Sequence, residues 1–451
     1  ASMRPNLPVG VIDGAGNYSG VMNTTPYKAA GLALNVPPQA IRVTDTTCDS
    51  TGSDLTAAQC RDRYLKWLVG LNNDTPFTRC PAGGTCSLIG DIYHSIPRAV
   101  PGRPAQFLID STYQKFVKDN AKRPSMLYAS SNDGFLHAFK IARVDADDPL
   151  PVNSPEKSNE LWAFIPPAVL PGLPSIYPAS HQLLLDGTPA IKEVVATKDE
   201  MQPVYKYRLM RTLQQAQGGT NEWRTILVQG FGAQRPGYFA LDITDPVGGP
   251  KFLWQLITDG AGNPLFGIGG ATPLITTVYL EGSEVAVAVL PGGYGSPGTD
   301  NPSTNNKGCA RNKDYASGWP ANVPLPRTNV KCYTGSAVLA RSVTVVRLDS
   351  GEILRTFRQD DAEVPGVVSS LVKEVPLDSP MTGQPVAYPP DVAGVADRVF
   401  IGDQDGALWR LNFASEKGKL DDWTLDLFFD GFPKDSFPAD EAWKRGQPII
   451  A

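Results

Sequence analysis

Short apolar runs of strand length recur along most of the chain, and turn residues bound each of them. The runs fall into four consecutive sets of four, which predicts four antiparallel units of four strands. After the fourth set, Gln447 and Pro448 begin a fifth. The predicted strands are 95–100, 126–130, 135–141 and 161–165; 188–196, 225–230, 238–243 and 252–257; 272–280, 284–290, 342–348 and 352–357; and 369–375, 398–401, 407–413 and 424–429.

The position of a run within its set is marked chemically. Most opening runs follow a proline. Proline has no backbone N–H, so it suits the start of a strand, where no hydrogen bond to the neighbouring strand is lost. The second and third runs are joined by turns such as Asp133-Gly134 and Asp405-Gly406, which favour tight hairpins. The tripeptides at the opening runs are Ser95-Ile96-Pro97, Gly187-Thr188-Pro189, Ala271-Thr272-Pro273, Val368-Ser369-Ser370 and, for the fifth set, Gly446-Gln447-Pro448.

This repeat predicts the fold class. A four-stranded antiparallel unit cannot bury both of its faces alone, and stacking such units around a common axis leaves only short edges exposed. We therefore predict an all-β protein, a β-propeller of four-stranded blades with long inserted loops, over residues 88–451. Binding is expected to reside in those loops.

Residues 1–87 have a different pattern and predict a separate N-terminal segment. Apolar and polar residues between Leu55 and Leu71 follow near-helical spacing, which predicts a short amphipathic helix. The remainder is rich in Pro, Gly and Asn and carries candidate disulfides. We expect this segment to pack on the propeller or to complete it.

The six cysteines form three sequence-local couples in polar loop sequence. None has the paired two-residue spacing of a zinc site, so disulfides are the favoured interpretation. Disulfides persist in oxidising compartments, which predicts an extracytoplasmic protein. The alternative is a cytosolic protein with reduced, buried thiols. The predicted couples are Cys48 with Cys60, Cys80 with Cys86, and Cys309 with Cys332.

Charge and hydropathy narrow the classes of partner. A formal net charge of -5 without a long basic run argues against nucleic acid, because binding to it depends on cations that neutralise phosphates. No run approaches the roughly 18 apolar residues of a membrane-spanning helix, and no signal-peptide pattern opens the chain. We therefore expect a mature or trimmed chain that further sequence precedes.

Catalytic motifs are not apparent in the sequence. His94, His137 and His181 each lie beside strand-like sequence, and we expect them to bridge strands by hydrogen bonds. The Gly-rich stretches 267–270 and 292–294 lack the Gly-Lys-Ser/Thr ending of a phosphate loop, so they predict tight turns.

Calcium is the metal that the loop composition suggests. Flexible loops bind calcium when oxygen ligands alternate along a turn. Between residues 391 and 397, only Asp391 and Asp397 supply carboxylates, and Ala393 stands where a further ligand would help. This loop is a degenerate candidate, and its acids could equally be solvated turn residues.

An ordered series of motifs resembles the PilC/PilY family of type IV pilus tip adhesins. No single motif is specific, but their order and spacing across residues 88–451 are. The motifs are LIGDIYHSIP at 88–97, YASSNDGFLHAF at 128–139, ELWAFIP at 160–166, DGTP at 186–189, WRTILV at 223–228, GYFALDITDP at 237–246 and IGDQDGALW at 401–409.

This resemblance implies a C-terminal propeller that is exported through the periplasm and works at the pilus tip. There it would act with minor pilins in pilus assembly, surface adhesion and twitching motility, as a non-catalytic binding module. The resemblance also implies a calcium loop before the strand at 398–401. The matching positions here are Pro389, Asp391, Ala393 and Asp397, so half of the ligands are missing and calcium control is in doubt.

Two other functions remain as alternatives. A propeller quinoprotein dehydrogenase would need a Glu, Asn and Asp set around calcium, and often a pair of adjacent cysteines. The sequence contains no adjacent cysteines. A purely structural scaffold with freely varying surface loops is the third interpretation.

Overall fold

The computed structural model of the chain describes most of its strand-forming part and several shorter stretches. The described residues are 10–12, 18–22, 42, 55–68, 89–102, 104, 110–142, 160–176, 181–198, 207–212, 222–258, 264–296, 333, 339–358, 371–390, 394–415, 418–431 and 447–449.

Four antiparallel sheets, here called blades 1 to 4, hold most of the described strands, and strands that are neighbours in sequence are mostly neighbours in a sheet. Blade 1 contains β3 (Arg98–Val100), β4 (Ser125–Ser130), β5 (Leu136–Ala142) and β6 (Glu160–Phe164). Blade 2 contains β7 (Pro189–Lys198), β10 (Glu222–Gly230), β11 (Tyr238–Asp242) and β12 (Lys251–Leu256). Blade 3 contains β13 (Leu274–Leu280), β14 (Ser283–Pro291), β15 (Ser342–Arg347) and β16 (Ile353–Arg358). Blade 4 contains β18 (Val386–Tyr388), β19 (Arg398–Gly402), β20 (Ala407–Asn412) and β21 (Thr424–Asp430).

The remaining elements decorate these blades. β8 pairs with β7, β9 pairs with β14, and β17 pairs in parallel with β16. Helix α1 packs on the core that blades 1 and 2 share. The bounds are α1 (Ala57–Leu68), α2 (Ser111–Asp119), η3 (Pro167–Ser175), η8 (Leu420–Asp422), β1 (Gly10–Ile12), β2 (Tyr18–Met22), β8 (Tyr207–Arg208), β9 (Met210–Thr212) and β17 (Val372–Glu374).

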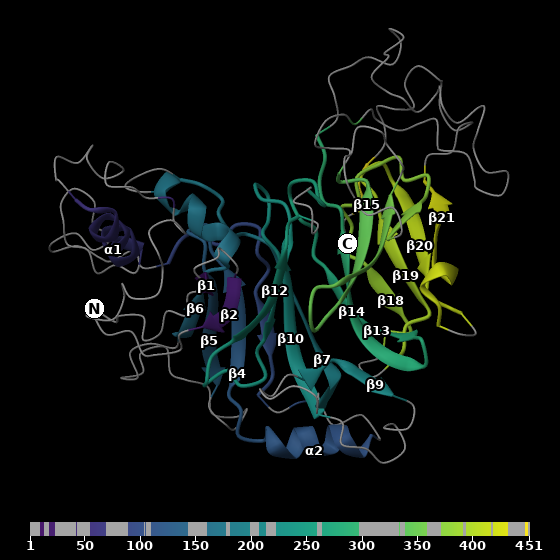
Figure 1. Cartoon of the computed structure of the whole chain (residues 1–451), viewed down its shortest axis with the longest axis horizontal. Helices are drawn as coiled ribbons and strands as arrows, with labels where there is room; N and C mark the ends of the chain where they lie inside the picture. The colour runs from purple at the N-terminus through teal and green to yellow at the C-terminus, as the bar shows by residue number, and fades with distance from the viewer. Residues whose placement is uncertain are drawn as a thin grey trace, which may run out of the picture.

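The predicted fold class is confirmed: the chain is mostly β-structure, built as four-stranded antiparallel blades. The blades lie side by side in chain order, and the described part of the chain forms an open arc of a propeller (Figure 1). The predicted helix between Leu55 and Leu71 is present as α1. The boundary between residues 87 and 88 lies outside the described residues and stays a prediction.

One predicted strand is wrong. Residues 369–375 were expected to open the fourth set, but β17 within them joins the edge of blade 3 instead. The opening strand of blade 4 is β18, which pairs with β19. The sequence did contain a signal for β18. The strand follows Gly383-Gln384-Pro385, and the same tripeptide recurs as Gly446-Gln447-Pro448.

Three apolar cores hold the blades together, one between each neighbouring pair. In β10, Leu227 points into the core shared with blade 1, whereas Ile226 and Val228 point into the core shared with blade 3. β14 alternates in the same way between blades 2 and 4. Successive residues of a strand face opposite sides of the sheet. One strand therefore contributes side chains to two cores, and the blades stack face to face.

In blade 4 the turn between β19 and β20 is closed by a buried aspartate. Asp403 Oδ1 accepts hydrogen bonds from the N–H groups of Asp405 (2.9 Å) and Ala407 (2.8 Å). Its Oδ2 accepts one from Trp409 Nε1 at 3.0 Å. Gly406 has φ +89°, which glycine adopts without strain. A single carboxylate therefore links the turn to the following strand.

Blade 1 has a turn of the same shape between β4 and β5. The Ser131 N–H donates to Phe135 O at 2.9 Å, and Gly134 has φ +98°. Ser131 Oγ lies 2.7 Å from His137 Nε2, and His137 Nδ1 lies 2.6 Å from Glu160 Oε1. Ser131 and His137 are 0% exposed, so this chain of polar groups has no access for a substrate and serves to join the strands.

Candidate binding groove

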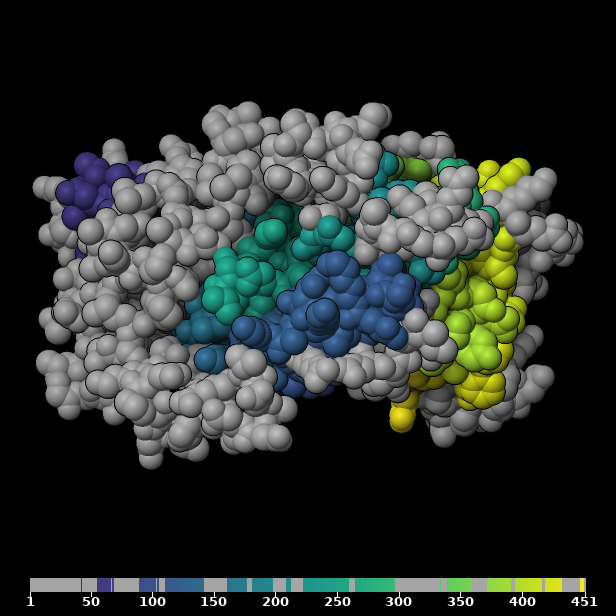
Figure 2. All heavy atoms as spheres, turned by 90° about the horizontal axis from the view of Figure 1, so that it is seen from below, coloured from purple at the N-terminus to yellow at the C-terminus, as the bar shows by residue number. Residues whose placement is uncertain are grey.

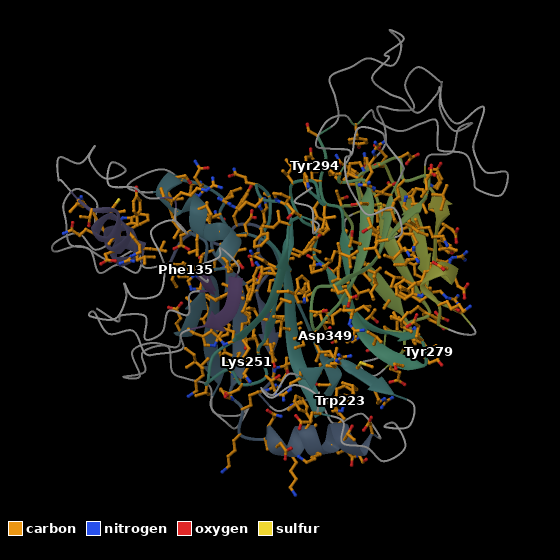
Figure 3. The ribbon with its side chains drawn as sticks, viewed as in Figure 1. Phe135, Trp223, Lys251, Tyr279, Tyr294 and Asp349 are labelled. Atoms are coloured by element: carbon orange, nitrogen blue, oxygen red, sulfur yellow. The ribbon has the colours of Figure 1, made fainter. Side chains whose placement is uncertain are left out.

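Helix α2 lies in the connection between β3 and β4 and runs across the lower ends of the strands of blade 2 (Figure 1). Tyr113, Phe116 and Val117 recur at helical spacing and are buried against Trp223 of β10, forming a small core of their own. The rings of Tyr113 and Trp223 meet edge to face, with centroids 4.7 Å apart. Figure 3 shows Trp223 beside α2, at the opposite end of the blades from Tyr294.

Asp110 fixes the start of α2. Its side chain caps the helix by accepting hydrogen bonds from the N–H groups of Thr112 (2.7 Å) and Tyr113 (3.3 Å). Burial alone would raise the pKa of Asp110. Hydrogen bonds from Thr112 and Tyr113 and the charge of Arg211 outweigh burial, so the pKa lies below its ordinary value of 3.8.

Arg211 of β9 ties α2 to blade 3. Its guanidinium lies 3.0 Å from Asp110 at the start of α2, and it holds Glu284 of β14 through two bonds of 2.7 and 3.0 Å. Planar, bidentate pairs of this kind are the strongest ordinary ion pairs. Because α2 lies in the β3–β4 connection of blade 1, and β9 and β14 pair in blade 3, the contact fixes α2 relative to the arc.

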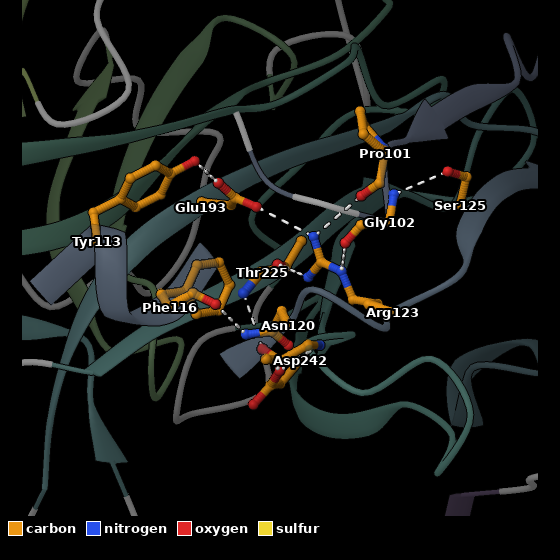
Figure 4. A network of polar contacts seen from close by, with 11 residues as sticks. Pro101, Gly102, Tyr113, Phe116, Asn120, Arg123, Ser125, Glu193, Thr225 and Asp242 are labelled. Carbon is orange, nitrogen blue, oxygen red and sulfur yellow. Dashed lines mark hydrogen bonds and ion pairs between the residues drawn. The ribbon is translucent and has the colours of Figure 1, made fainter. Parts of the chain in front are cut away.

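A second network anchors the other end of α2 (Figure 4). Buried Arg123 donates to Thr225 Oγ1 at 2.8 Å, to Gly102 O at 2.9 Å and to Glu193 Oε1 at 3.3 Å. The Tyr113 hydroxyl donates to the other oxygen of Glu193. Burial and this carboxylate raise the pKa of Tyr113, so the hydroxyl stays protonated as a donor. The helix is thus held by polar contacts at both ends.

Between α2 and β10 the surface is hollowed into a groove of about 680 Å³. Figure 2 shows this side of the molecule, with α2 lying across its middle. The largely buried Phe116 and Trp223 are among its lining residues, and Trp223 Nε1 donates to Thr112 Oγ1 at 3.0 Å. The volume lies within the usual range for ligand sites. The lining residues are Ser111, Thr112, Lys115, Phe116, Asp119, Asn120, Glu222, Trp223, Arg224 and Thr244.

The walls of the groove carry balanced charges. On α2, Lys115 forms an ion pair with Asp119 one helical turn later. On β10, Arg224 pairs with Glu222 at 3.0 Å. Each wall therefore contains one cation and one carboxylate that already neutralise each other. The groove can bind a polar ligand, but it offers no unpaired charge to attract an ion.

The predicted calcium loop is only partly described. Asp391 lies outside the described residues, and both carboxylate oxygens of Asp397 are held by Arg398, at 2.9 and 3.1 Å. A carboxylate neutralised in this way is a poor calcium ligand, because the cation would have to displace the guanidinium. Among the described residues, no cluster of three or more His, Cys, Asp or Glu side chains could hold a metal. The calcium candidate stays a prediction.

The predicted disulfides are largely outside the described residues. Cys60 is described and lies buried on α1, within the core of blades 1 and 2. Cys48, Cys80, Cys86, Cys309 and Cys332 fall outside, so the three predicted couples stay predictions.

All three histidines pair with carboxylates, in agreement with a hydrogen-bonding role. His137 joins two strands, as predicted. The other two differ in detail, because they join loops near the strand starts of blades 1 and 2 rather than strands. The pairs are His94 with Asp186 (2.6 Å), His137 with Glu160 (2.6 Å) and His181 with Asp91 (3.0 Å).

Sequence reasoning missed the groove, although one of its walls had a local signal. Asp110 before a run with Tyr113, Phe116 and Val117 is the pattern of a capped amphipathic helix. The other wall had none. The approach of β10 to α2 depends on long-range contacts such as the one from Arg123 to Thr225, which no local pattern encodes.

Comparison with known proteins finds related sequences. The chain is 26% identical over 351 residues to the type IV pilus biogenesis factor PilY1 of Pseudomonas aeruginosa, which covers 74% of this chain and 22% of that protein. A homologue of this factor in Xylella fastidiosa is 25% identical over 342 residues, covering 74% of this chain and 20% of the homologue. The chain thus spans about a fifth of the length of these relatives. No family model matches the chain.

Two solved structures are similar over most of the chain. The C-terminal domain of Pseudomonas aeruginosa PilY1 matches with 20% identity and a TM-score of 0.39, over 78% of this chain and 51% of that one. A quinohemoprotein alcohol dehydrogenase from Pseudomonas putida matches with 12% identity and a TM-score of 0.27, over 72% and 36%. At these TM-scores neither structure supports an assignment.

Proposed function

The chain is a sequence relative of the PilY1-type proteins of type IV pili, and from this premise we propose that it acts in type IV pilus biogenesis as a non-catalytic binding module. The observation that carries the proposal is the relation to PilY1 over 351 residues, 74% of the chain. From residue 89 onward, the ordered motifs fall on the strands and turns of the blades and on the loops that lead into β3 and β7.

The architecture supports a binding role. Three apolar cores and the contacts of Arg211 make the arc a rigid frame, and long insertions such as α2 project from it. Rigid frames that carry variable loops are a common basis of recognition. The groove beside α2 shows that at least one insertion forms a defined concave surface.

The finer proposals concern place and partners. We propose that the protein works outside the cytoplasm, at the cell surface or pilus tip, in contact with minor pilins, and that it contributes to surface adhesion and twitching motility. Among the described residues, no helix has the length and apolarity to span a membrane.

A deletion strain of the source bacterium tests the proposal. Loss of the gene should reduce surface pili in electron micrographs, reduce the twitching zone under agar and reduce attachment, and the intact gene should restore all three. Purified chain should also retain minor pilins in a pulldown, with and without calcium. Normal piliation in the deletion strain, together with no retention of pilins, would contradict the proposal.

A separate experiment tests the non-catalytic part. Addition of pyrroloquinoline quinone and calcium to the purified chain should produce neither a bound chromophore nor dye-linked oxidation of alcohols. Turnover in this assay would instead favour the quinoprotein alternative.

A further inference from the structure

We propose that the groove between α2 and β10 is a carbohydrate-binding site that takes a neutral saccharide. This inference rests on the groove alone, and it holds whether or not the chain acts in pilus biogenesis.

The charge of the groove selects the class of ligand. Lys115 is paired with Asp119 on one wall, and Arg224 with Glu222 on the other. A phosphate or an acidic peptide would gain the cations only by breaking these pairs and would meet two carboxylates in the same space. A neutral ligand meets no such repulsion.

The polar side chains of the groove suit neighbouring hydroxyl groups. A carboxylate accepts hydrogen bonds on two oxygens, and an amide or guanidinium presents donors in one plane. Two adjacent hydroxyls of a pyranose ring can bind such a group together. Glu222, Arg224 and Asn120 supply three groups of this kind around one cavity. The side chain of Glu222 is 48% exposed, so its oxygens are accessible.

The back of the groove is rigid. Phe116 and Trp223 line it but are only 6% and 2% exposed, because both pack into the small core beneath α2. Trp223 is further held by its bond to Thr112 Oγ1. A weak neutral ligand needs such a preformed site, because it cannot offset the entropy cost of ordering loops.

An extended peptide fits less well. Peptides commonly add to an open sheet edge, but β10 pairs with β7 along Glu222–Gln229 and with β11 from Ile226 onward. Before Ile226, the N–H of Thr225 already donates to Thr244 Oγ1, and its C=O accepts from Ile243 N. The open stretch of backbone at the groove is therefore too short for an added strand.

Glycan-array screening of the purified 451-residue chain, followed by titration, tests the proposal. The titration uses the methyl glycosides of glucose, galactose, mannose and N-acetylglucosamine, then oligosaccharides of the array class that binds. Mammalian-type glycans and bacterial polysaccharide fragments on the same array distinguish a host source from the bacterium's own coat. We expect saturable binding of at least one neutral saccharide, with NMR saturation transfer to its ring protons.

Two groove variants and one matched control locate the site. Glu222→Gln keeps the shape of the side chain, and Asn120→Ala removes the amide; each should weaken saccharide binding by about tenfold or more, as expected for a lost hydrogen bond to a polar ligand. Lys118→Ala removes an exposed residue of the same helix that does not line the groove, and it should leave binding unchanged. Circular dichroism checks that all three variants fold.

Several outcomes would overturn the proposal. One is the absence of binding to any neutral saccharide on the array. Another is saccharide binding that survives both groove substitutions, because the site would then lie elsewhere. Selective binding of charged glycans or of an extended peptide, lost on Glu222→Gln, would assign the groove to a different ligand class.

Discussion

Blades 1 and 4 build the same turn from different side chains. In blade 1, the Asn132 N–H donates to Asp91 O at 2.9 Å, and the Gly90 N–H donates to Asp133 Oδ2 at 3.0 Å. These bonds attach the turn to the loop that leads into the blade. At the start of the turn, Ser131 contacts His137.

In blade 4, the Gln404 N–H donates to Pro380 O at 2.9 Å, and Ser379 Oγ donates to Asp405 Oδ2 at 3.0 Å. The positions correspond one to one with those of blade 1, and Asp403 with its Trp409 bond replaces the serine and histidine. The comparison teaches that the turn geometry is fixed by backbone and glycine, whereas the side-chain pair that closes it is interchangeable. The blades also differ in their insertions, because α2 lies in the β3–β4 connection of blade 1.

The largest effect is expected from the side-chain pair that closes the turn of blade 4, Asp403 and Trp409. Trp409→Ala should lower the free energy of unfolding by about 3–5 kcal/mol, because it empties a buried site and removes a hydrogen bond to Asp403 Oδ2. Guanidinium denaturation measures the loss. Phe429→Ala, on an exposed ring of the same blade, is the control and should change stability little. Equal losses in both variants would contradict the role of the pair.

The equivalent change in blade 1 should cost less. His137→Ala removes a smaller ring but leaves Glu160 buried without this partner, so we expect a loss of about 2–3 kcal/mol in the same assay. His181→Ala, an exposed histidine that also pairs with a carboxylate, should cost under about 1 kcal/mol. If His137→Ala were as mild as His181→Ala, the two blades would not be equivalent.

The insertion that distinguishes blade 1 can be loosened without touching either turn. Arg211→Ala should lower stability by about 1–2 kcal/mol, because Asp110 and Glu284 lose a shared, half-buried cation. Hydrogen exchange should show faster exchange in α2 and unchanged exchange in blade 4. Lys122→Ala, an exposed cation close to α2, is the control. Unchanged exchange in α2 would show that Arg211 does not hold the helix.

The smallest expected effect depends on pH. The lowered pKa of Asp110 means that its ionised form stabilises the fold above its ordinary pKa of 3.8 and that this contribution is lost as pH falls through the lowered value. Asp110→Asn keeps a capping side chain but removes the charge. At neutral pH the free energies of unfolding of the two proteins should differ by about 0.5–1 kcal/mol. Their melting temperatures, which measure this difference, should converge in acid. A difference that is constant across pH would exclude this linkage.

Most of the fold was predictable from the sequence, because its strands are long, apolar and bounded by turns. β18 was missed because it is short and follows a Pro-rich stretch, so the longer run at 369–375 was preferred. The proline rule would have found it through Gly383-Gln384-Pro385. The strand β9 carries no local signal, since its three residues gain their structure from long-range contacts with β14 and β7.

The candidate site was less predictable than the fold. The helix of the groove has a capping signal at Asp110, but its placement depends on Arg123 and Arg211, whose partners lie far away in sequence. Which arginine is buried in a network and which is solvated cannot be known before the blades are stacked. The sequence therefore indicates where an insertion lies, but not the surface that it forms.

The two-sided burial of the interior strands has a consequence for how the chain finds its alignment. In most half-buried sheets, a slip of one residue is penalised because it turns polar residues inward and apolar ones outward. In β14 a slip of one residue would exchange the apolar residues that face one core for those that face the other. The two sets are Val285, Val287 and Val289, and Ala286, Ala288 and Leu290. Correct pairing must therefore be enforced at the strand ends, so errors in the hairpins should lead to misfolded blades more often than errors in the interior.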